Sequence, residues 1–124
     1  MRRLVMAVIL AAILSLAANA NAGACAWPFG PLHRYLYATA PYPAWQEQVI
    51  ACESGWDAGA TSWAGAMGIA QFMPSTWRWG QQLYGIYGSP YDPYASIAMM
   101  NAFWRDGYSY MWDCARYLKV APTE

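Results

Sequence analysis

Three segments of the chain begin with a proline and are followed by a glycine. The pairs are Pro43 with Gly55, Pro74 with Gly85, and Pro93 with Gly107. Proline suits the first helical turn, because the N–H group that it lacks would have no partner there. Glycine ends helices readily, because it adopts the left-handed conformation without strain. Apolar residues recur at helical spacing within these segments, which predicts helices over residues 43–54, 74–84 and 93–106.

The remaining segments are short and do not sustain the apolar–polar alternation of a strand, so the predicted fold class is mostly α. Asp92 suits the N-cap position of the helix that follows it. Residues 55–66 contain three glycines and predict a loop, and residues 66–72 predict a short helical piece. Beyond residue 107 we expect a last helix. Residues 23–42, rich in proline and aromatic residues, predict an irregular lead-in with one helical turn at 33–37.

The first 22 residues have the order of a secretory signal peptide. Arg2 and Arg3 precede an apolar run over residues 4–18, and small residues and asparagines follow. That run is shorter than the roughly 20 residues of a bilayer span. An uncleaved anchor is the alternative. We expect residues 1–22 to be the signal, 23–42 the lead-in and 43–124 the domain, exported to the periplasm or beyond the cell.

Charge excludes one class of partner. The 124 residues carry seven basic and seven acidic side chains, and only 11% of them are charged. A chain without net charge has no field that would attract nucleic acid. The high aromatic content, 17%, suits both the core of a small domain and a groove that stacks on sugars. His33 is the single histidine and stands outside any metal-ligand cluster, so we assign it no role and predict no metal.

Three cysteines follow the predicted signal, namely Cys25, Cys52 and Cys114. Export places them in an oxidising compartment, where pairing is expected, and an odd number leaves one over. A bridge between Cys52 and Cys114 would close a long loop and stabilise the fold; two separately buried thiols are the alternative. Cys25 lies in a sequence similar to a bacterial lipoprotein box, with Ala22 where leucine is usual. Lipidation, which would anchor the protein to the membrane, and a free or intermolecular thiol both stay open for Cys25.

Glu53 is the candidate catalytic acid. It stands at the predicted C-terminus of a helix, where the helix dipole raises the pKa of a carboxyl group. The neighbouring Trp56, Trp63 and Phe72 could add an apolar wall that raises it further. A carboxyl group that stays protonated near neutral pH can serve as a general acid. A solvated surface carboxylate is the alternative for a lone acid at a helix end.

The sequence from Glu53, ESGWDAGATSWAGAMGIAQFMPSTW, resembles the catalytic domain of soluble lytic transglycosylases. That resemblance implies a small lysozyme-like (goose-type) helical domain with a substrate groove. It implies Glu53 as catalytic residue and a groove lined by Ser62, Gly68, Gln71, Phe72 and Met73. The late Ala-Tyr-Asn motif of the family is missing here, and Asn101 and Tyr108 or Tyr110 lie where a substitute for it could sit.

A second resemblance concerns the cysteines. Cys52-Glu53-Ser54-Gly55 and Trp112-Asp113-Cys114 are similar to secreted resuscitation-promoting factors. In that family the cysteine before the catalytic glutamate is bonded to one near the C-terminus. The resemblance therefore implies a disulfide between Cys52 and Cys114.

The resemblance also implies a reaction. The enzyme would cleave the β-1,4 bond between N-acetylmuramic acid and N-acetylglucosamine in peptidoglycan strands, forming a 1,6-anhydro product. We expect no cofactor and a monomer, with a cell-wall or secretion-machinery protein as a candidate partner. No aspartate in the sequence is a persuasive second carboxylate, which favours this reaction over hydrolysis. A hydrolytic muramidase on the same fold and a non-catalytic wall-binding protein remain the alternatives.

Overall fold

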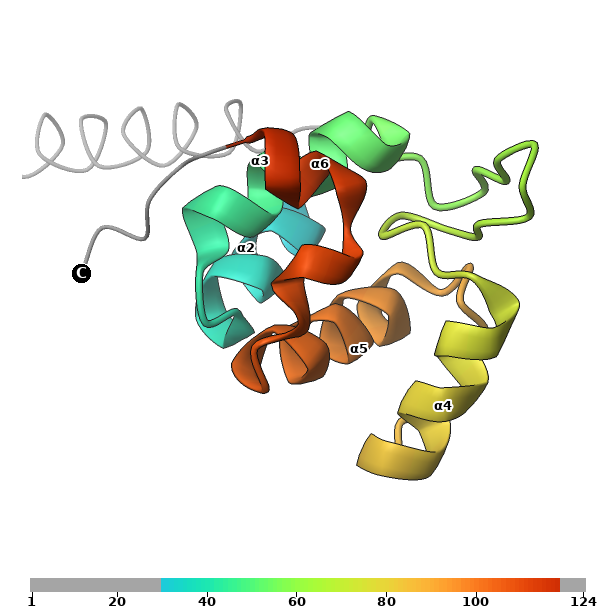
Figure 1. Cartoon of the computed structure of the whole chain (residues 1–124). Helices are drawn as coiled ribbons and strands as arrows, with labels where there is room; N and C mark the ends of the chain where they lie inside the picture. The colour runs from blue at the N-terminus through green and yellow to red at the C-terminus, as the bar shows by residue number, and fades with distance from the viewer. Residues whose placement is uncertain (1–29, 119–124) are drawn as a thin grey trace, which may run out of the picture. The chain divides into compact units, whose positions relative to one another are not determined.

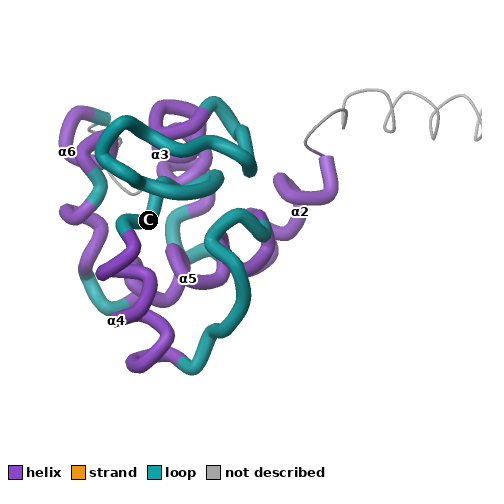
Figure 2. Tube along the Cα trace, turned by 90° about the vertical axis from the view of Figure 1, so that its right-hand side faces the viewer, coloured by secondary structure: helices purple, strands orange, loops and turns teal. Residues whose placement is uncertain are grey.

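The computed structural model describes residues 30–118 of the chain (Figure 1). The predicted signal peptide and Cys25 lie outside the described residues. Within them the chain forms five α-helices and one 3₁₀ helix, joined by loops (Figure 2). The elements are α2 (Gly30–Thr39), α3 (Pro43–Ser54), α4 (Pro74–Tyr84), α5 (Pro93–Arg105), η1 (Tyr108–Met111) and α6 (Asp113–Tyr117). The predicted mostly-α fold is confirmed.

The three helices predicted from proline and glycine are all present. Gly55 and Gly85 end α3 and α4 in the left-handed conformation, with φ of 62° and 64°. The Asp92 side chain caps α5 by accepting hydrogen bonds from the N–H groups of Tyr94 and Ala95. These ends need only local chemistry, which explains why the sequence locates them.

Helices at the two ends of the domain differ from the prediction. The predicted single turn at 33–37 is part of a ten-residue helix, α2. The predicted last helix is divided into η1 and α6, because Trp112 adopts an extended conformation with ψ of 122°. Its indole N–H donates to the Ala70 carbonyl at 2.8 Å. This long-range bond ties the break in the helix to the loop before α4.

The helical piece predicted over residues 66–72 is wrong. Met67 and Phe72 instead exchange two backbone hydrogen bonds of 2.9 Å each, as in a small hairpin. Gly68 and Gln71 both have positive φ, 76° and 55° respectively. A helix cannot contain two left-handed residues, so the chain turns back on itself here.

Gly68 lies against the loop that precedes α5. A Cβ atom added there would be 1.9 Å from the Pro90 carbonyl oxygen. Glycine is therefore needed at this position twice over, for its positive φ and for the close approach of two backbones.

The core is built from apolar side chains of every helix but η1, together with the hairpin. Phe72 stands near its centre, 2% exposed, and its ring packs against those of Trp77, Phe103 and Trp112. Among the described residues, no helix is long and apolar enough to span a bilayer.

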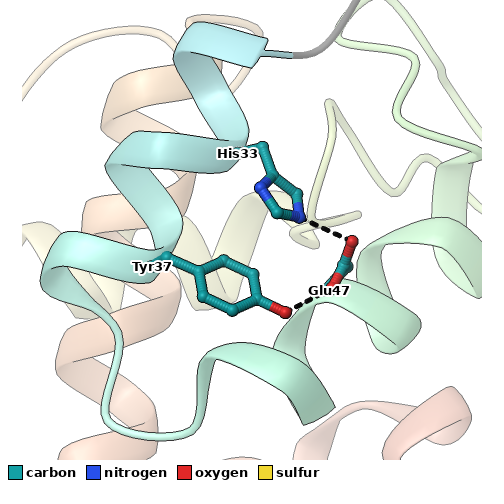
Figure 3. Close-up of polar contacts among 3 residues, drawn as sticks. All are labelled: His33, Tyr37 and Glu47. Carbon is teal, nitrogen blue, oxygen red and sulfur yellow. Dashed lines mark hydrogen bonds and ion pairs between the residues drawn. The ribbon is translucent and has the colours of Figure 1, made fainter. Parts of the chain in front are cut away.

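A polar cluster fastens α2 to α3. Figure 3 shows His33 and Tyr37 of α2 reaching Glu47 of α3. The Glu47 carboxylate accepts from the Tyr37 hydroxyl at 2.6 Å and lies 2.7 Å from His33 Nε2. The His33 and Tyr37 rings are stacked, with centroids 4.5 Å apart. His33, to which the sequence assigns no role, therefore serves to hold these two helices together.

One covalent bond joins the end of α3 to α6. Cys52 and Cys114 form a disulfide across 62 positions of sequence. In Figure 1 the two helices lie side by side. The bridge fixes a five-residue helix that is too short to be stable by itself.

We predict that loss of this disulfide costs about 2–4 kcal/mol of unfolding free energy, because a long loop is released in the unfolded chain. The measurement is urea denaturation of Cys52→Ser/Cys114→Ser against its parent, both carrying Cys25→Ser to exclude thiol exchange. Reduced parent protein is the control and should match the double variant. Equal midpoints for oxidised and reduced parent would contradict the prediction.

We predict that Gly68→Ala lowers the unfolding free energy by about 3 kcal/mol or more, from strain and overlap combined. Gly65→Ala is the matched control. Gly65 has φ of 90° but open space where the added Cβ atom would stand, so only strain of about 1–2 kcal/mol is expected. Thermal and urea unfolding would measure both. Similar losses of unfolding free energy in the two variants would contradict the prediction, because the loop at Pro90 would then move away at little cost.

Candidate active site

A cleft of about 330 Å³ opens beside the C-terminal turn of α3. Four segments supply its walls: the end of α3, the loop after it, the hairpin running into α4, and the junction of η1 with α6. The lining residues are Glu53, Ser62, Trp63, Ala64, Ala66, Gln71, Phe72, Met73, Thr76, Met111, Trp112 and Asp113. Five of the residues that the sequence predicts for a site are therefore brought together, namely Glu53, Ser62, Gln71, Phe72 and Met73.

Glu53 lies in the last turn of α3, half-buried in the cleft wall. Burial raises the pKa of its carboxyl group above the ordinary value. A hydrogen bond of 3.3 Å from the Cys114 backbone N–H to Oε1 lowers that pKa, and the negative charge of Asp113 raises it again. The balance is upward, so Glu53 holds its proton to higher pH than a solvated glutamate does.

The residues next to Glu53 fix its position. Cys52 carries the disulfide, so the turn that bears Glu53 is bonded to α6. On the other side, the Ser54 hydroxyl lies 2.7 Å from the Ile69 carbonyl oxygen, to which it donates. Glu53 is thus held between a covalent bond and a hydrogen bond, each leading to a different wall of the cleft.

Ser62 and Gln71 line the cleft through tightly bonded turns. Ser62 Oγ accepts from the Ala66 N–H at 3.0 Å. Gln71 Nε2 donates to the Gly68 and Ala60 carbonyl oxygens, at 2.9 and 3.3 Å. These bonds occupy both amide hydrogens of Gln71 and fix the plane of its amide group at the cleft wall.

Phe72 and Met73 have different positions in the wall. Phe72 is a core residue, 2% exposed, that also belongs to the cleft lining, whereas Met73 is 40% exposed at the N-terminus of α4. Met73 is therefore the one of the two that leaves apolar surface open for a ligand.

Three residues predicted for the groove lie elsewhere. Gly68 is buried against the Pro90 carbonyl. Asn101 is 1% exposed; its amide accepts from Gln46 Nε2 at 2.8 Å and donates to Thr39 Oγ1 at 2.9 Å. Tyr108 packs edge-on against Phe103 and Trp79 outside the cleft lining. These three residues are therefore not among the lining of the cleft around Glu53.

The groove predicted from the sequence lacks four further lining residues that could contact a ligand: Trp63, which the sequence suggests only as an apolar wall for Glu53, Thr76, Met111 and Asp113. Trp63 and Thr76 belong to the same continuous stretch as Glu53 and could have been included from it. Met111 and Asp113 also line the cleft but lie about 60 residues after Glu53 in the sequence. Only the pairing of Cys52 with Cys114 could have indicated them, because it brings residues near 114 to Glu53.

The chemistry available in this cleft is that of a half-buried carboxylic acid beside polar groups of fixed orientation. Glu53 and Asp113 are the charged residues among its described lining. The described part of the chain has no cluster of three histidine, cysteine or acidic side chains that could hold a metal ion. Proton transfer by Glu53 is the reaction step that this arrangement supports.

The sequence model of one protein family, the transglycosylase SLT domain, matches residues 43–117, more than half of the chain. The matched region contains Glu53, all of the cleft lining and both bonded cysteines. Searches among curated proteins and among solved structures found no match. The family implies a transglycosylase that acts on peptidoglycan. Together with the helical fold and the cleft around Glu53, this match places the chain in the SLT transglycosylase domain family.

Proposed function

We propose that this protein is an exported lytic transglycosylase that cleaves the β-1,4 bond between N-acetylmuramic acid and N-acetylglucosamine. Glu53 acts as general acid and then as general base. The observation that carries the proposal is the raised pKa of a half-buried Glu53 carboxyl in the wall of the cleft, within an SLT domain.

In the first step, protonated Glu53 gives its proton to the glycosidic oxygen as the bond to C1 breaks. The acetamide oxygen of the muramic acid stabilises the positive charge at C1, as in substrate-assisted glycosidases that need one protein carboxyl group. Ionised Glu53 then takes the proton of the C6 hydroxyl, and the C6 oxygen bonds to C1. The product is a 1,6-anhydro sugar, Glu53 regains its proton, and no water is consumed.

Ser62 and Gln71 support the proposal as substrate-positioning groups. Their hydrogen bonds to the turn backbone hold them at the cleft wall without a substrate. Polar groups that are already oriented lose little entropy when a sugar binds, and this favours the aligned geometry. We assign them to hydrogen bonds with the acetamide and hydroxyl groups of the glycan.

Export is supported by the disulfide and by the order of the first 22 residues. Disulfides persist in the periplasm and outside the cell, whereas cytosolic thiols are kept reduced. The bond between Cys52 and Cys114 next to Glu53 therefore suits an enzyme that works on the cell wall.

Hydrolysis is the second candidate function, because Asp113 shares the cleft with Glu53. An inverting glycosidase uses a second carboxylate to activate water. The Asp113 carboxylate is largely exposed and lies 3.1 Å from the Arg116 guanidinium, with which it pairs. Because the Asp113 carboxylate is paired with Arg116, it is less suited to activate a water molecule. We therefore assign Asp113 to an electrostatic effect on the pKa of Glu53. A wall-binding protein without turnover is the third candidate.

We predict that wild-type protein releases 1,6-anhydro muropeptides from purified peptidoglycan and that Glu53→Gln reduces the rate at least about 100-fold, because the acid is lost. Mass spectrometry of the products is the measurement, since anhydro and hydrated ends differ by one water. Glu47→Gln, a change of the same kind outside the cleft, is the control. Hydrated ends would assign the reaction to hydrolysis, and no release by any variant would favour the wall-binding protein.

We predict that Asp113→Asn keeps activity and moves the alkaline limb of the pH–rate profile to lower pH. The negative charge of Asp113 raises the pKa of Glu53, so its removal lets Glu53 lose its proton sooner as pH rises. The shift should shrink in high salt, which screens exposed charges. Loss of activity at every pH would instead identify Asp113 as the second carboxylate of a hydrolase.

A further inference from the structure

Trp63 is fully exposed at the cleft, with a relative accessibility of 101%. The tryptophans Trp77, Trp104 and Trp112 are core residues, each at most 5% exposed, and Trp79 is 36% exposed. An indole in water gains none of the free energy that burial would provide. The fold therefore does not account for a tryptophan at this position.

The turn that carries Trp63 is held firmly by its own hydrogen bonds. Trp63 and Ala64 are the central residues of a turn closed by the Gly65 N–H, which donates to the Ser62 carbonyl at 3.0 Å. The Ser62 N–H donates to the Ala66 carbonyl at 2.9 Å, and the Ala66 N–H donates to Ser62 Oγ. The loop presents an aromatic side chain from a fixed backbone, so little conformational entropy is lost when something stacks on it.

Its neighbours indicate the chemistry of the occupant. Ser62 and Gln71 supply polar groups to the same cleft, and Met73 supplies a second exposed apolar side chain. The charged residues of the described lining are the acids Glu53 and Asp113. An uncharged ligand with hydroxyl groups on its edge and C–H groups on its face fits this combination, and a pyranose ring is such a ligand.

We propose that Trp63 is the sugar-stacking residue of this cleft. Its indole covers the apolar face of one ring of the glycan strand. The inference rests on the proposed function and adds a binding residue to it. Trp63 acts on ground-state binding and takes no part in proton transfer, so its loss should change KM and leave kcat.

The experiment measures binding without turnover. A neutral N-acetylglucosamine pentamer is titrated by calorimetry into four inactive proteins. One carries Glu53→Gln alone, and the other three carry Glu53→Gln together with Trp63→Ala, Trp63→Phe or Tyr87→Ala. Tyr87 is the matched control, because it is 74% exposed on another loop and is not part of the cleft lining. We expect Trp63→Ala to weaken binding about tenfold, Trp63→Phe about threefold or less, and Tyr87→Ala not at all.

Two further readouts separate this role from a structural one. Trp63→Ala should unfold within about 3 °C of its parent, because an exposed side chain is lost. In otherwise wild-type protein, Trp63→Ala should raise KM for soluble glycan strands about tenfold and leave kcat within about twofold. The reason is that the lost contact is equally strong in the bound substrate and in the transition state.

The outcomes distinguish the two proposals. Equal pentamer affinity and equal KM with and without the Trp63 indole would overturn the stacking role, while anhydro products from wild type would leave the proposed function standing. A tenfold loss on Trp63→Ala with no product from wild type would support the sugar site and overturn the enzyme. A large fall in thermal midpoint, or an equal loss with Tyr87→Ala, would overturn a specific contact at Trp63.

Discussion

The disulfide between Cys52 and Cys114 is the constraint on which the site depends. It joins the residue before Glu53 to the short helix α6, which brings Trp112 and Asp113 into the cleft and lets the Cys114 N–H reach the carboxylate. α6 has only five residues and could not keep that position by helix propensity. The wall next to Glu53 is thus held by a covalent bond, and the environment of the Glu53 carboxyl group follows from it.

Glu53 is placed between opposing influences. Burial raises the pKa of its carboxyl group, the Cys114 N–H lowers it, and the charge of Asp113 raises it. In the proposed reaction Glu53 gives and then regains a proton, which requires both the protonated and the ionised form to be populated near working pH. The partial burial of Glu53 suits this requirement, whereas a fully buried or fully solvated carboxyl would favour one form too strongly.

Much of the fold and part of the site could be predicted from the sequence. The bounds of α3, α4 and α5 could be predicted from proline and aspartate at helix starts and glycine after helix ends. This is possible because helix caps are formed by residues that are neighbours in sequence. The prediction for residues 66–72 is wrong because their apolar spacing suits a helix, whereas positive φ at Gly68 and Gln71 and the contact with Pro90 impose a hairpin. Residues of that continuous stretch, Ser62 and Gln71 among them, can be found from their order beside Glu53.

The sequence alone determined α3, α4, α5 and the family and indicated Glu53 as the candidate acid, because these depend on contiguous residues and local backbone chemistry. Only the tertiary structure decided which distant residues share the cleft with Glu53. Asn101 lies in the core, where its side-chain amide links α5 to Gln46 of α3 and Thr39 of α2. Asp113, by contrast, lies in the cleft lining. The physical reason is that burial and long-range hydrogen bonds are settled by packing among helices, and spacing along one helix does not specify its neighbours.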